Sequence, residues 1–264
     1  MDLGLTGKVA LVTGSTAGIG LAAATGFARE GAHVFVNGRT LERVEQARAK
    51  ILAVVPNASV SAAVGDVSTA EGVNAIVRAA PSVDVLVNNA GIFEPKAFAD
   101  ITDEDWLHFF QTNVMSGVRL SRAYFPLMLK AGWGRIVFIA SESAVQIPAE
   151  MIHYGTTKTA QLAVSRGLAE LTVGTRVTVN TVLPGPTYSD GVGQFVSDLA
   201  ASRGTDAKTM EHEFFTHARP SSLLQRFATV EEIANLIVYV ASAAASATNG
   251  AALRVDGGVV RSIL

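Results

Sequence analysis

Tyr154 and Lys158 stand four positions apart in the stretch His153–Lys158. On a helix this spacing places the phenol and the ammonium on one face, with Cβ atoms about 5–6 Å apart. A nearby ammonium stabilises a phenolate and lowers the pKa of a tyrosine from its usual value of about 10. Most such pairs are ordinary neighbours on a helix surface, so the pair gains meaning only with a cofactor site in the same domain. With one, we predict that Tyr154 acts as a general acid.

A glycine-rich turn lies far upstream of this pair, in the stretch Thr13–Gly20. Gly14, Gly18 and Gly20 stand between a predicted strand and a predicted helix. Glycine there permits a tight turn and lets backbone amides approach a pyrophosphate at the helix N-terminus. The spacing is Gly-x-x-x-Gly-x-Gly rather than Gly-x-Gly-x-x-Gly. Glycines at a turn often mean only a turn, but the flanking strand and helix predict a nucleotide site.

The residues after the second predicted strand bear on which nucleotide is bound. A carboxylate about 20 residues beyond the glycine turn would hold a ribose 2′-hydroxyl. Here the chain has Asn37, Gly38 and Arg39, with no acid until Glu42. An arginine can hold a 2′-phosphate through two hydrogen bonds. The alternative is that Arg39 is a solvated side chain at the start of the next helix. We predict NADP(H), preferred over NAD(H), with Asn37 and Arg39 at its site.

Short, nearly continuous apolar runs alternate with helical stretches along the chain. The predicted strands are Val9–Thr13, His33–Asn37, Val60–Val64, Val83–Asn88, Arg135–Ala140, Arg176–Val182 and Ala251–Val255. The predicted helices are Gly18–Glu30, Leu41–Val54, Thr69–Ala79, Asp103–Lys130, Tyr154–Thr172 and Val230–Ser242. Apolar strands that alternate with helices are typical of parallel strands covered on both faces. We therefore predict an α/β fold, a doubly wound seven-stranded parallel sheet with helices on both faces.

Length and composition limit the number of domains, the classes of partner and the kinds of site that the chain can have. No segment of the 264 residues reads as a linker, so we predict one domain over 1–264, and the long connection Pro184–Phe227 is predicted to be a substrate loop or lid. A net charge of −2 without a basic stripe argues against nucleic acid and membrane surfaces. The absence of cysteine excludes disulfides, thiolate metal sites and a thiol nucleophile. Without a signal-peptide pattern or a long apolar run, we expect a cytoplasmic protein.

Seven motifs, in order, resemble those of the short-chain dehydrogenase/reductase family. They are Thr13–Gly20, Asp66-Val67, Asn88-Asn89-Ala90-Gly91, Asn113, Ser141, Tyr154 with Lys158, and Pro184-Gly185. The closing segment Asn249–Gly258 also resembles the last strand and turn of that family. The resemblance implies a Rossmann-like fold. It also implies an NADP(H)-dependent oxidoreductase that transfers hydride between the nicotinamide and a carbonyl or secondary alcohol.

The resemblance implies a role for each catalytic residue. The Ser141 hydroxyl is expected to bond a substrate carbonyl, and Tyr154 to donate the proton, or to accept it in the oxidative direction. Lys158 is expected to lower the Tyr154 pKa and to bind the nicotinamide ribose. Asn113 is implied to hold a water that links Lys158 to a proton relay. Hydride moves directly from the cofactor, so no metal is expected.

The resemblance also implies the cofactor contacts. Asp66 and Val67 would flank the adenine, and the hydroxyls of Ser15 and Thr16 would reach the 2′-phosphate end. The other expected contacts are Gly14, Gly18, Ile19, Gly20, Asn89, Ala90, Gly91, Tyr154, Lys158, Pro184, Gly185 and Thr187. The family often has a basic residue before the second glycine when it prefers NADP, and here that position is Ala17.

Side chains between Ser141 and Tyr154 are expected to border the substrate pocket, and aromatic residues of the long connection to close over it. The first group is Glu142, Ser143, Gln146, Ile147 and His153, and the second is Tyr188, Phe195, Phe214 and Phe215. We predict substrate contacts from Ser141, Ser143, Tyr154 and Tyr188, and packing at a helix start for His153. An apolar pocket with few fixed charges would suit ketones, aldehydes or 3-oxoacyl groups better than a free sugar or a polyanion.

Two other functions remain open at this point. One is an enzyme similar to 3-oxoacyl-[acyl-carrier-protein] reductase, although no basic cluster for an acyl-carrier protein stands out. The other is a catalytically silent scaffold or sensor that binds NADP(H). Loss of a catalytic residue would mark the second, and none of the four is lost.

The chain is also predicted to assemble with copies of itself. The helices Asp103–Lys130 and Tyr154–Thr172 have more apolar residues than one core face needs, and the tail Val259–Leu264 is apolar. The apolar residues concerned are Val114, Leu120, Tyr124, Phe125, Leu162, Val164, Leu168 and Leu171. Surplus apolar surface usually marks an interface. Relatives in the family are often tetramers built on these helices, so we predict a homotetramer, with a dimer as the alternative.

Overall fold

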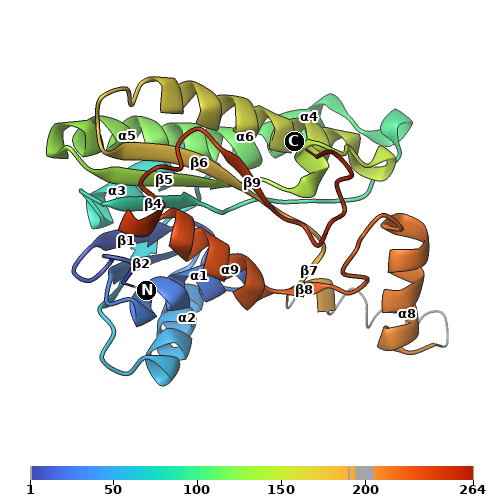
Figure 1. Cartoon of the computed structure of the whole chain (residues 1–264), viewed down its shortest axis with the longest axis horizontal. Helices are drawn as coiled ribbons and strands as arrows, with labels where there is room; N and C mark the ends of the chain where they lie inside the picture. The colour runs from blue at the N-terminus through green and yellow to red at the C-terminus, as the bar shows by residue number, and fades with distance from the viewer. Residues whose placement is uncertain (1, 190, 194–204, 264) are drawn as a thin grey trace.

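A computed structural model describes residues 2–189, 191–193 and 205–263 of the chain. Seven strands form one sheet in the order β3-β2-β1-β4-β5-β6-β9 (Figure 1). All six neighbouring pairs are parallel. The strands are β1 (Val9–Val12), β2 (His33–Gly38), β3 (Val60–Val64), β4 (Val85–Asn88), β5 (Gly134–Ile139), β6 (Val177–Pro184) and β9 (Ala252–Val255). The predicted seven-stranded parallel sheet is confirmed.

Helices cover both faces of the sheet, as Figure 1 shows. On one face lie α1 (Gly18–Arg29), α2 (Leu41–Val54) and α9 (Val230–Val240). On the other lie α3 (Ala70–Ala79), α5 (Ser116–Ala131) and α6 (Ile152–Glu170). Strand order reverses between β1 and β4, so the crevice at the carboxyl ends of these strands is where ligands bind in such folds.

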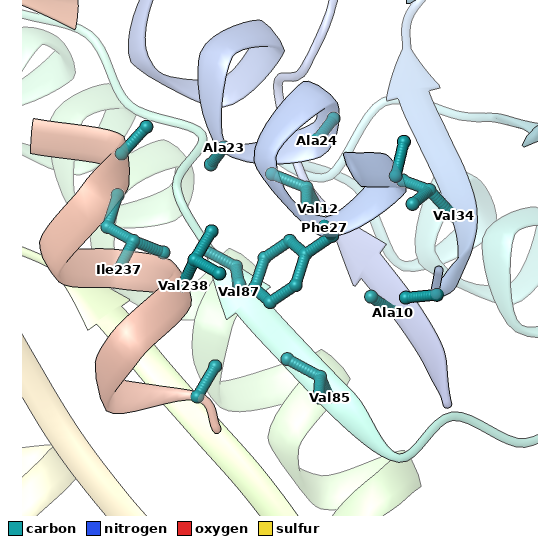
Figure 2. Close-up of a cluster of buried hydrophobic side chains, with 14 of the residues drawn as sticks. Ala10, Val12, Ala23, Ala24, Phe27, Val34, Val85, Val87, Ile237 and Val238 are labelled. Atoms are coloured by element: carbon teal, nitrogen blue, oxygen red, sulfur yellow. The ribbon is translucent and has the colours of Figure 1, made fainter. Parts of the chain in front are cut away.

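Two apolar cores follow from the alternation of side chains along the strands. Val12 and Val87 point to the α1 and α9 side, where Phe27 and Ile237 meet them (Figure 2). Leu11, next to Val12, packs in the opposite core with residues of α3 and α5. Because both faces are covered, the strands are apolar at successive positions. The sheet is therefore a rigid platform whose carboxyl edge carries the predicted site.

The predicted helix Asp103–Lys130 is wrong in one respect, because it is interrupted. The structure has α4 (Asp103–Phe110), a π-helical turn η2 (Gln111–Met115) and then α5. Thr102 caps α4 through a capping box with Asp105. The C-cap of α5 is Gly132 with φ of +71°, a left-handed conformation that favours glycine. The interruption falls on Asn113, one of the predicted catalytic residues.

The connection predicted as a substrate loop contains its own small elements. Among its described residues they include β7 (Thr187–Tyr188), α8 (Ala207–Glu213) and the π-helical turn η5 (Phe214–Ala218), and β8 (Ala228–Thr229) follows directly after Phe227. β7 and β8 pair in parallel, and α8 stands beside the main body in Figure 1. Met210, Phe215 and Phe227 form a separate small apolar cluster. Phe195, expected to help close the pocket, lies outside the described residues.

The predicted surplus of apolar surface is only partly present. Val114, Leu120, Tyr124 and Phe125 are buried in the chain's own core. Within the tail, Val259 and Val260 are also buried, whereas Ile263 is exposed. Among the described residues, no helix has the length and apolar character needed to cross a membrane.

Candidate active site

The glycine turn joins β1 to α1 at the carboxyl edge of the sheet. Gly14 and Gly18 have φ of +59° and +56°, which side chains rarely adopt. A Cβ on Gly20 would lie 2.5 Å from the Gly14 carbonyl oxygen and from Asn89 Nδ2. The turn thus depends on glycine at all three positions, and it leaves the α1 N-terminus open, since Ala17 gives no side-chain cap. Unpaired amides at such an end attract anions.

The side chains of Asn37 and Ser15 hold the glycine turn in place through hydrogen bonds to the backbone. Asn37 Oδ1 accepts from the Gly14 amide at 3.1 Å, and its Nδ2 donates to the carbonyls of Ala63 at 2.8 Å and Gly65 at 3.1 Å. Ser15 Oγ donates to the Val12 carbonyl and accepts from the Asn37 amide. The prediction that the Ser15 hydroxyl reaches a 2′-phosphate is therefore wrong, because that hydroxyl is buried and its bonds are made inside the protein. The Asn37 side chain, which was predicted to lie at the cofactor site, also makes its hydrogen bonds inside the protein and holds the turn in place.

Asn89 ties the end of β4 to the same turn. Its Nδ2 donates to the carbonyls of Thr13 at 2.8 Å and Gly14 at 3.2 Å. The Thr13 hydroxyl accepts from the amides of Asn89 and Ala90 at 2.9 Å and 3.0 Å. These contacts lock the ends of β1 and β4 together at the point where strand order reverses.

The predicted adenosine end lies beyond β2 and β3. Arg39 is exposed after β2, and its charge is one of the influences on Asp66. Burial alone would raise the Asp66 pKa, but hydrogen bonds from Ser68 outweigh it and the pKa is lowered. Val67 is buried in the core, so its side chain is not presented to a ligand. Of the residues predicted for the adenosine end, Arg39 and Asp66 carry the charged groups.

Ser141, Tyr154 and Lys158 come together at the end of β5. Ser141 follows the strand in extended conformation, and its hydroxyl accepts from the Ser143 amide at 3.1 Å. Lys158 Nζ lies 5.6 Å from the centre of the Tyr154 ring and donates to the Ile139 carbonyl at 3.0 Å. The four-residue spacing on α6 thus places both groups on the face that meets β5.

The pKa values of this pair differ from the expectation. Burial raises the Tyr154 pKa above its usual value, against smaller opposing effects of the Ser141 hydrogen bond and the Arg219 charge. Burial also lowers the Lys158 pKa to about 8. The predicted lowering of the Tyr154 pKa by Lys158 is therefore wrong for this structure, because loss of hydration is the larger effect. A raised pKa keeps the phenol protonated at neutral pH.

Asn113 lies in the π-helical turn and is fully buried. Its Oδ1 accepts from the Ile92 amide at 2.8 Å, and its Nδ2 donates to the Ile92 carbonyl and to Thr157 Oγ1, both at 3.0 Å. A Cβ built on Gly91 would be 3.3 Å from both Asn113 Oδ1 and Lys158 Nζ. Gly91 therefore lets the two groups approach the same space, which a side chain would fill.

One cavity of about 370 Å³ joins the turn to Ser141, Tyr154 and Lys158. Of the predicted site residues, its lining includes Ile19, Asn89, Gly91, Ser141, Ser143, Tyr154, Lys158, Pro184, Gly185 and Thr187. Several predicted pocket residues lie outside this lining. Tyr188 is half exposed and contacts Phe227 edge-on. Gln146 and Ile147 are exposed, and Phe215 packs in the small cluster. His153 is buried against Phe109, with ring centres 4.1 Å apart, which agrees with the predicted packing role.

The cavity also carries charges that the sequence reading did not anticipate. Arg219 Nε lies 3.1 Å from Glu142 Oε1, and Arg219 Nη1 lies 3.1 Å from Glu150 Oε1. All three residues line the cavity, and the side chains of Glu142 and Arg219 are only 7% and 11% exposed. Ser141 Oγ donates to Glu142 Oε2. The expectation of few fixed charges is therefore wrong: an ion pair is buried beside Ser141.

Comparison with known proteins assigns the family. Residues 8–200 match the family profile described as short chain dehydrogenase, which is more than half of the chain. The chain belongs to the short-chain dehydrogenase family. The uncharacterized oxidoreductase YvaG of Bacillus subtilis is 48% identical over 263 residues, 100% of both chains. D-beta-hydroxybutyrate dehydrogenase of Cupriavidus necator is 33% identical and covers 97% of this chain and 99% of its own.

A solved structure of the short-chain dehydrogenase family agrees closely with this one. L-sorbose reductase from Gluconobacter frateurii, complexed with NADPH and L-sorbose, superimposes with a TM-score of 0.94. It is 34% identical to this chain and covers 100% of both chains. The similarity thus extends over the whole sheet.

The residues of this short-chain dehydrogenase are suited to a nicotinamide dinucleotide. An extended ligand needs a continuous path from an anion-binding helix end to the reacting groups. The cavity gives that path from Ile19 of the turn, past Asn89 and Gly91, to Tyr154 and Lys158. Sequence motifs identified most of this path, whereas Arg219 and Glu150 had no local signal.

Proposed function

We propose that the protein is an NADP(H)-dependent oxidoreductase that transfers hydride between the nicotinamide and a carbonyl compound or secondary alcohol. The observation that carries the proposal is the single cavity shared by the glycine turn, the β4 and β6 ends and the Ser141, Tyr154 and Lys158 side chains. A silent scaffold would have no need for the four catalytic side chains in this arrangement.

The proposed chemistry assigns a task to each residue. The bound nicotinamide supplies or accepts the hydride. Ser141 donates a hydrogen bond to the substrate carbonyl, and Tyr154 gives that oxygen a proton. The raised Tyr154 pKa supports this task, since the phenol is protonated when a carbonyl is reduced near neutral pH. Lys158 and Asn113, which face the space beside Gly91, hold the ribose and a water of the proton relay.

Our proposed preference for NADP(H) rests on Arg39. Its exposed guanidinium follows β2, where an acid would hold the 2′-hydroxyl of NAD. The NADPH complex of L-sorbose reductase supports the same preference in this chain. Thr16, whose side chain packs near Gly38, completes the proposed 2′-phosphate site, and the α1 N-terminus is proposed to bind the pyrophosphate.

The assembly and the cellular location stay predictions. For a homotetramer, the support is that Leu107, Phe110 and Leu127 on α4 and α5, and Leu171 just after α6, remain exposed. Light scattering at micromolar concentration tests it, and a mass near 27.5 kDa would contradict it. The expected location remains the cytoplasm.

The proposed activity is tested with purified protein, NADPH and a panel of ketones and aldehydes, followed at the nicotinamide absorbance. Reduction with NADPH preferred over NADH is the expected result. If no carbonyl is reduced and no alcohol is oxidised with either cofactor, the proposal fails.

A further inference from the structure

The buried Glu142 carboxylate has two donors in the cavity wall. Ser141 Oγ donates to Glu142 Oε2, and Arg219 Nε lies 3.1 Å from Glu142 Oε1. Arg219 comes from the connection after β6, 77 positions away, and Glu150 holds its other end at 3.1 Å. The Ser141 hydroxyl already accepts from the Ser143 amide, so its one proton goes to Glu142.

A substrate would change this arrangement. In the reaction proposed above, the Ser141 proton turns to the substrate carbonyl, and Glu142 Oε2 then loses its donor. The Ser143 amide cannot replace that donor, because it donates to Ser141 Oγ. Arg219 still holds Oε1, but a buried carboxylate oxygen left without a donor is unfavourable. The substrate itself is the natural source of a replacement.

The geometry limits where that replacement stands on the substrate. Ser141 Oγ bonds Glu142 Oε2 now and would bond the carbonyl oxygen in the complex, so the two acceptors lie within two hydrogen-bond lengths of each other. A hydroxyl on the carbon next to the carbonyl reaches that far. An alkyl group at the same place would cover the carboxylate and give it no donor.

The charges at this wall also disfavour an anionic substrate. The Arg219 guanidinium is shared between two carboxylates, so it is not free to hold a third. A carboxylate next to the reacting carbonyl would face Glu142 instead. The other cation of the described lining, Lys158, donates to the Ile139 carbonyl on the Tyr154 side.

We propose that Glu142, held by Arg219, selects uncharged substrates that carry a hydroxyl on the carbon next to the carbonyl. Such substrates are α-hydroxy ketones or aldehydes, and the products are the corresponding 1,2-diols. The inference rests on the proposed function, because it assumes that the Ser141 hydroxyl binds a carbonyl.

Three small ketones of similar size test the selection: hydroxyacetone, acetone and the anion pyruvate. With NADPH, the wild-type kcat/KM for hydroxyacetone is expected to exceed that for acetone by about 10–100-fold, the usual effect of one buried hydrogen bond to a charged group. Pyruvate is expected to be reduced more slowly than hydroxyacetone. Equal kcat/KM for hydroxyacetone and acetone would overturn the inference and leave the proposed function intact.

Two variants show whether Glu142 is responsible. Glu142→Ala removes the acceptor, so the ratio of hydroxyacetone to acetone should fall to about 1. Glu142→Gln keeps an acceptor oxygen and removes the charge, so it should retain the hydroxyl preference and gain activity on pyruvate relative to wild type. Glu170→Ala is the matched control, since Glu170 pairs with Arg166 in an exposed ion pair on α6. Its ratios should equal those of the wild type.

Binding without turnover gives an independent readout. With NADPH bound, 1,2-propanediol and 2-propanol cannot be oxidised, and saturation-transfer NMR can rank their affinities. The diol should bind more tightly to the wild type but not to Glu142→Ala. A hydroxyl preference that persists in Glu142→Ala contradicts the inference. If no compound reacts in either direction with either cofactor, the proposed function fails and the inference with it.

Discussion

Under the glycine turn, polar side chains bond to backbone groups, whereas beside Ser141 charged side chains bond to one another. Asn37 and Asn89 each bridge backbone atoms of neighbouring strand ends, so their bonds are fixed by the sheet itself. Glu142 and Arg219 meet across the cavity from segments with no strand in common. In the proposed function, the first region supports the cofactor that relatives have in common, and the second region contacts the substrate.

The largest expected effect is on the catalytic side. Tyr154→Phe removes the proton donor and keeps the ring, so turnover should fall by about 10²–10⁴-fold, as is usual for an acid–base group. NADPH affinity, measured by fluorescence titration, should change little. Turnover close to wild type would contradict the role given to Tyr154.

The frame beneath the turn is tested by Asn37→Ala. This change removes three hydrogen bonds to backbone groups, and we expect a loss of about 3 kcal/mol in the free energy of unfolding, at about 1 kcal/mol each. Urea denaturation measures it. The exposed Asn57→Ala is the control and should lie within about 0.5 kcal/mol of wild type. An equal effect of the two changes would mean that Asn37 does not support the turn.

At the outer end of the cofactor region, Arg39→Ala should raise the KM for NADPH by about 10–100-fold, because a charged partner of the 2′-phosphate is lost. The KM for NADH should change little. Lys50→Ala removes an exposed cation from α2, the helix that follows Arg39, and serves as the control. A wild-type enzyme that already uses NADH better than NADPH would refute the assignment.

The smallest expected effect is at His153, which lies at the start of α6 and packs against Phe109 of α4. Both ring nitrogens are buried and have no partner among the described residues. Burial lowers the His153 pKa, and the Lys96 charge lowers it further. The charges of Asp105 and Glu94 oppose this shift but are the smaller influence. The neutral form is therefore the one that fits the fold, so stability is full above the unfolded pKa of 6.5 and is lost as pH falls through the folded value.

His153→Leu should accordingly stabilise the protein by about 1 kcal/mol and weaken the fall in thermal stability between about pH 7 and 5. Differential scanning calorimetry across that range measures both quantities. The exposed His217→Leu is the control. An unchanged pH dependence in His153→Leu would show that another group causes the fall.

The sequence predicted the sheet well, because parallel strands buried on both faces are apolar at most positions and often at successive ones, as at Leu11 and Val12. It did not predict the break at Asn113. That break is associated with a tertiary contact, since Gln161 Nε2 donates to the Asn113 carbonyl at 2.6 Å. Such a contact leaves no periodic signal in the helix itself.

The candidate site divides in the same way. Motif residues such as Gly14, Asn89 and Tyr154 could be identified because local spacing determines where they lie. The hydrogen bonds of the Ser15 hydroxyl could not be predicted, because they form with the Val12 carbonyl and the Asn37 amide only in the folded chain. Arg219 could not either, because only the folded connection brings it to Glu142.

The π-helical turn Gln111–Met115 has a consequence for insertions and deletions. Such a turn holds one residue more than an α-helix of the same rise, so α4 and α5 are offset in rotation by about 100°, the angle of one residue. Deleting one residue there would let the two helices fuse into one continuous rod. The face of α4 that packs on α6 would then rotate away, and Asn113 would leave its place beside Gly91. Alignment gaps in this stretch are therefore expected to mark relatives that lack the proton relay proposed here.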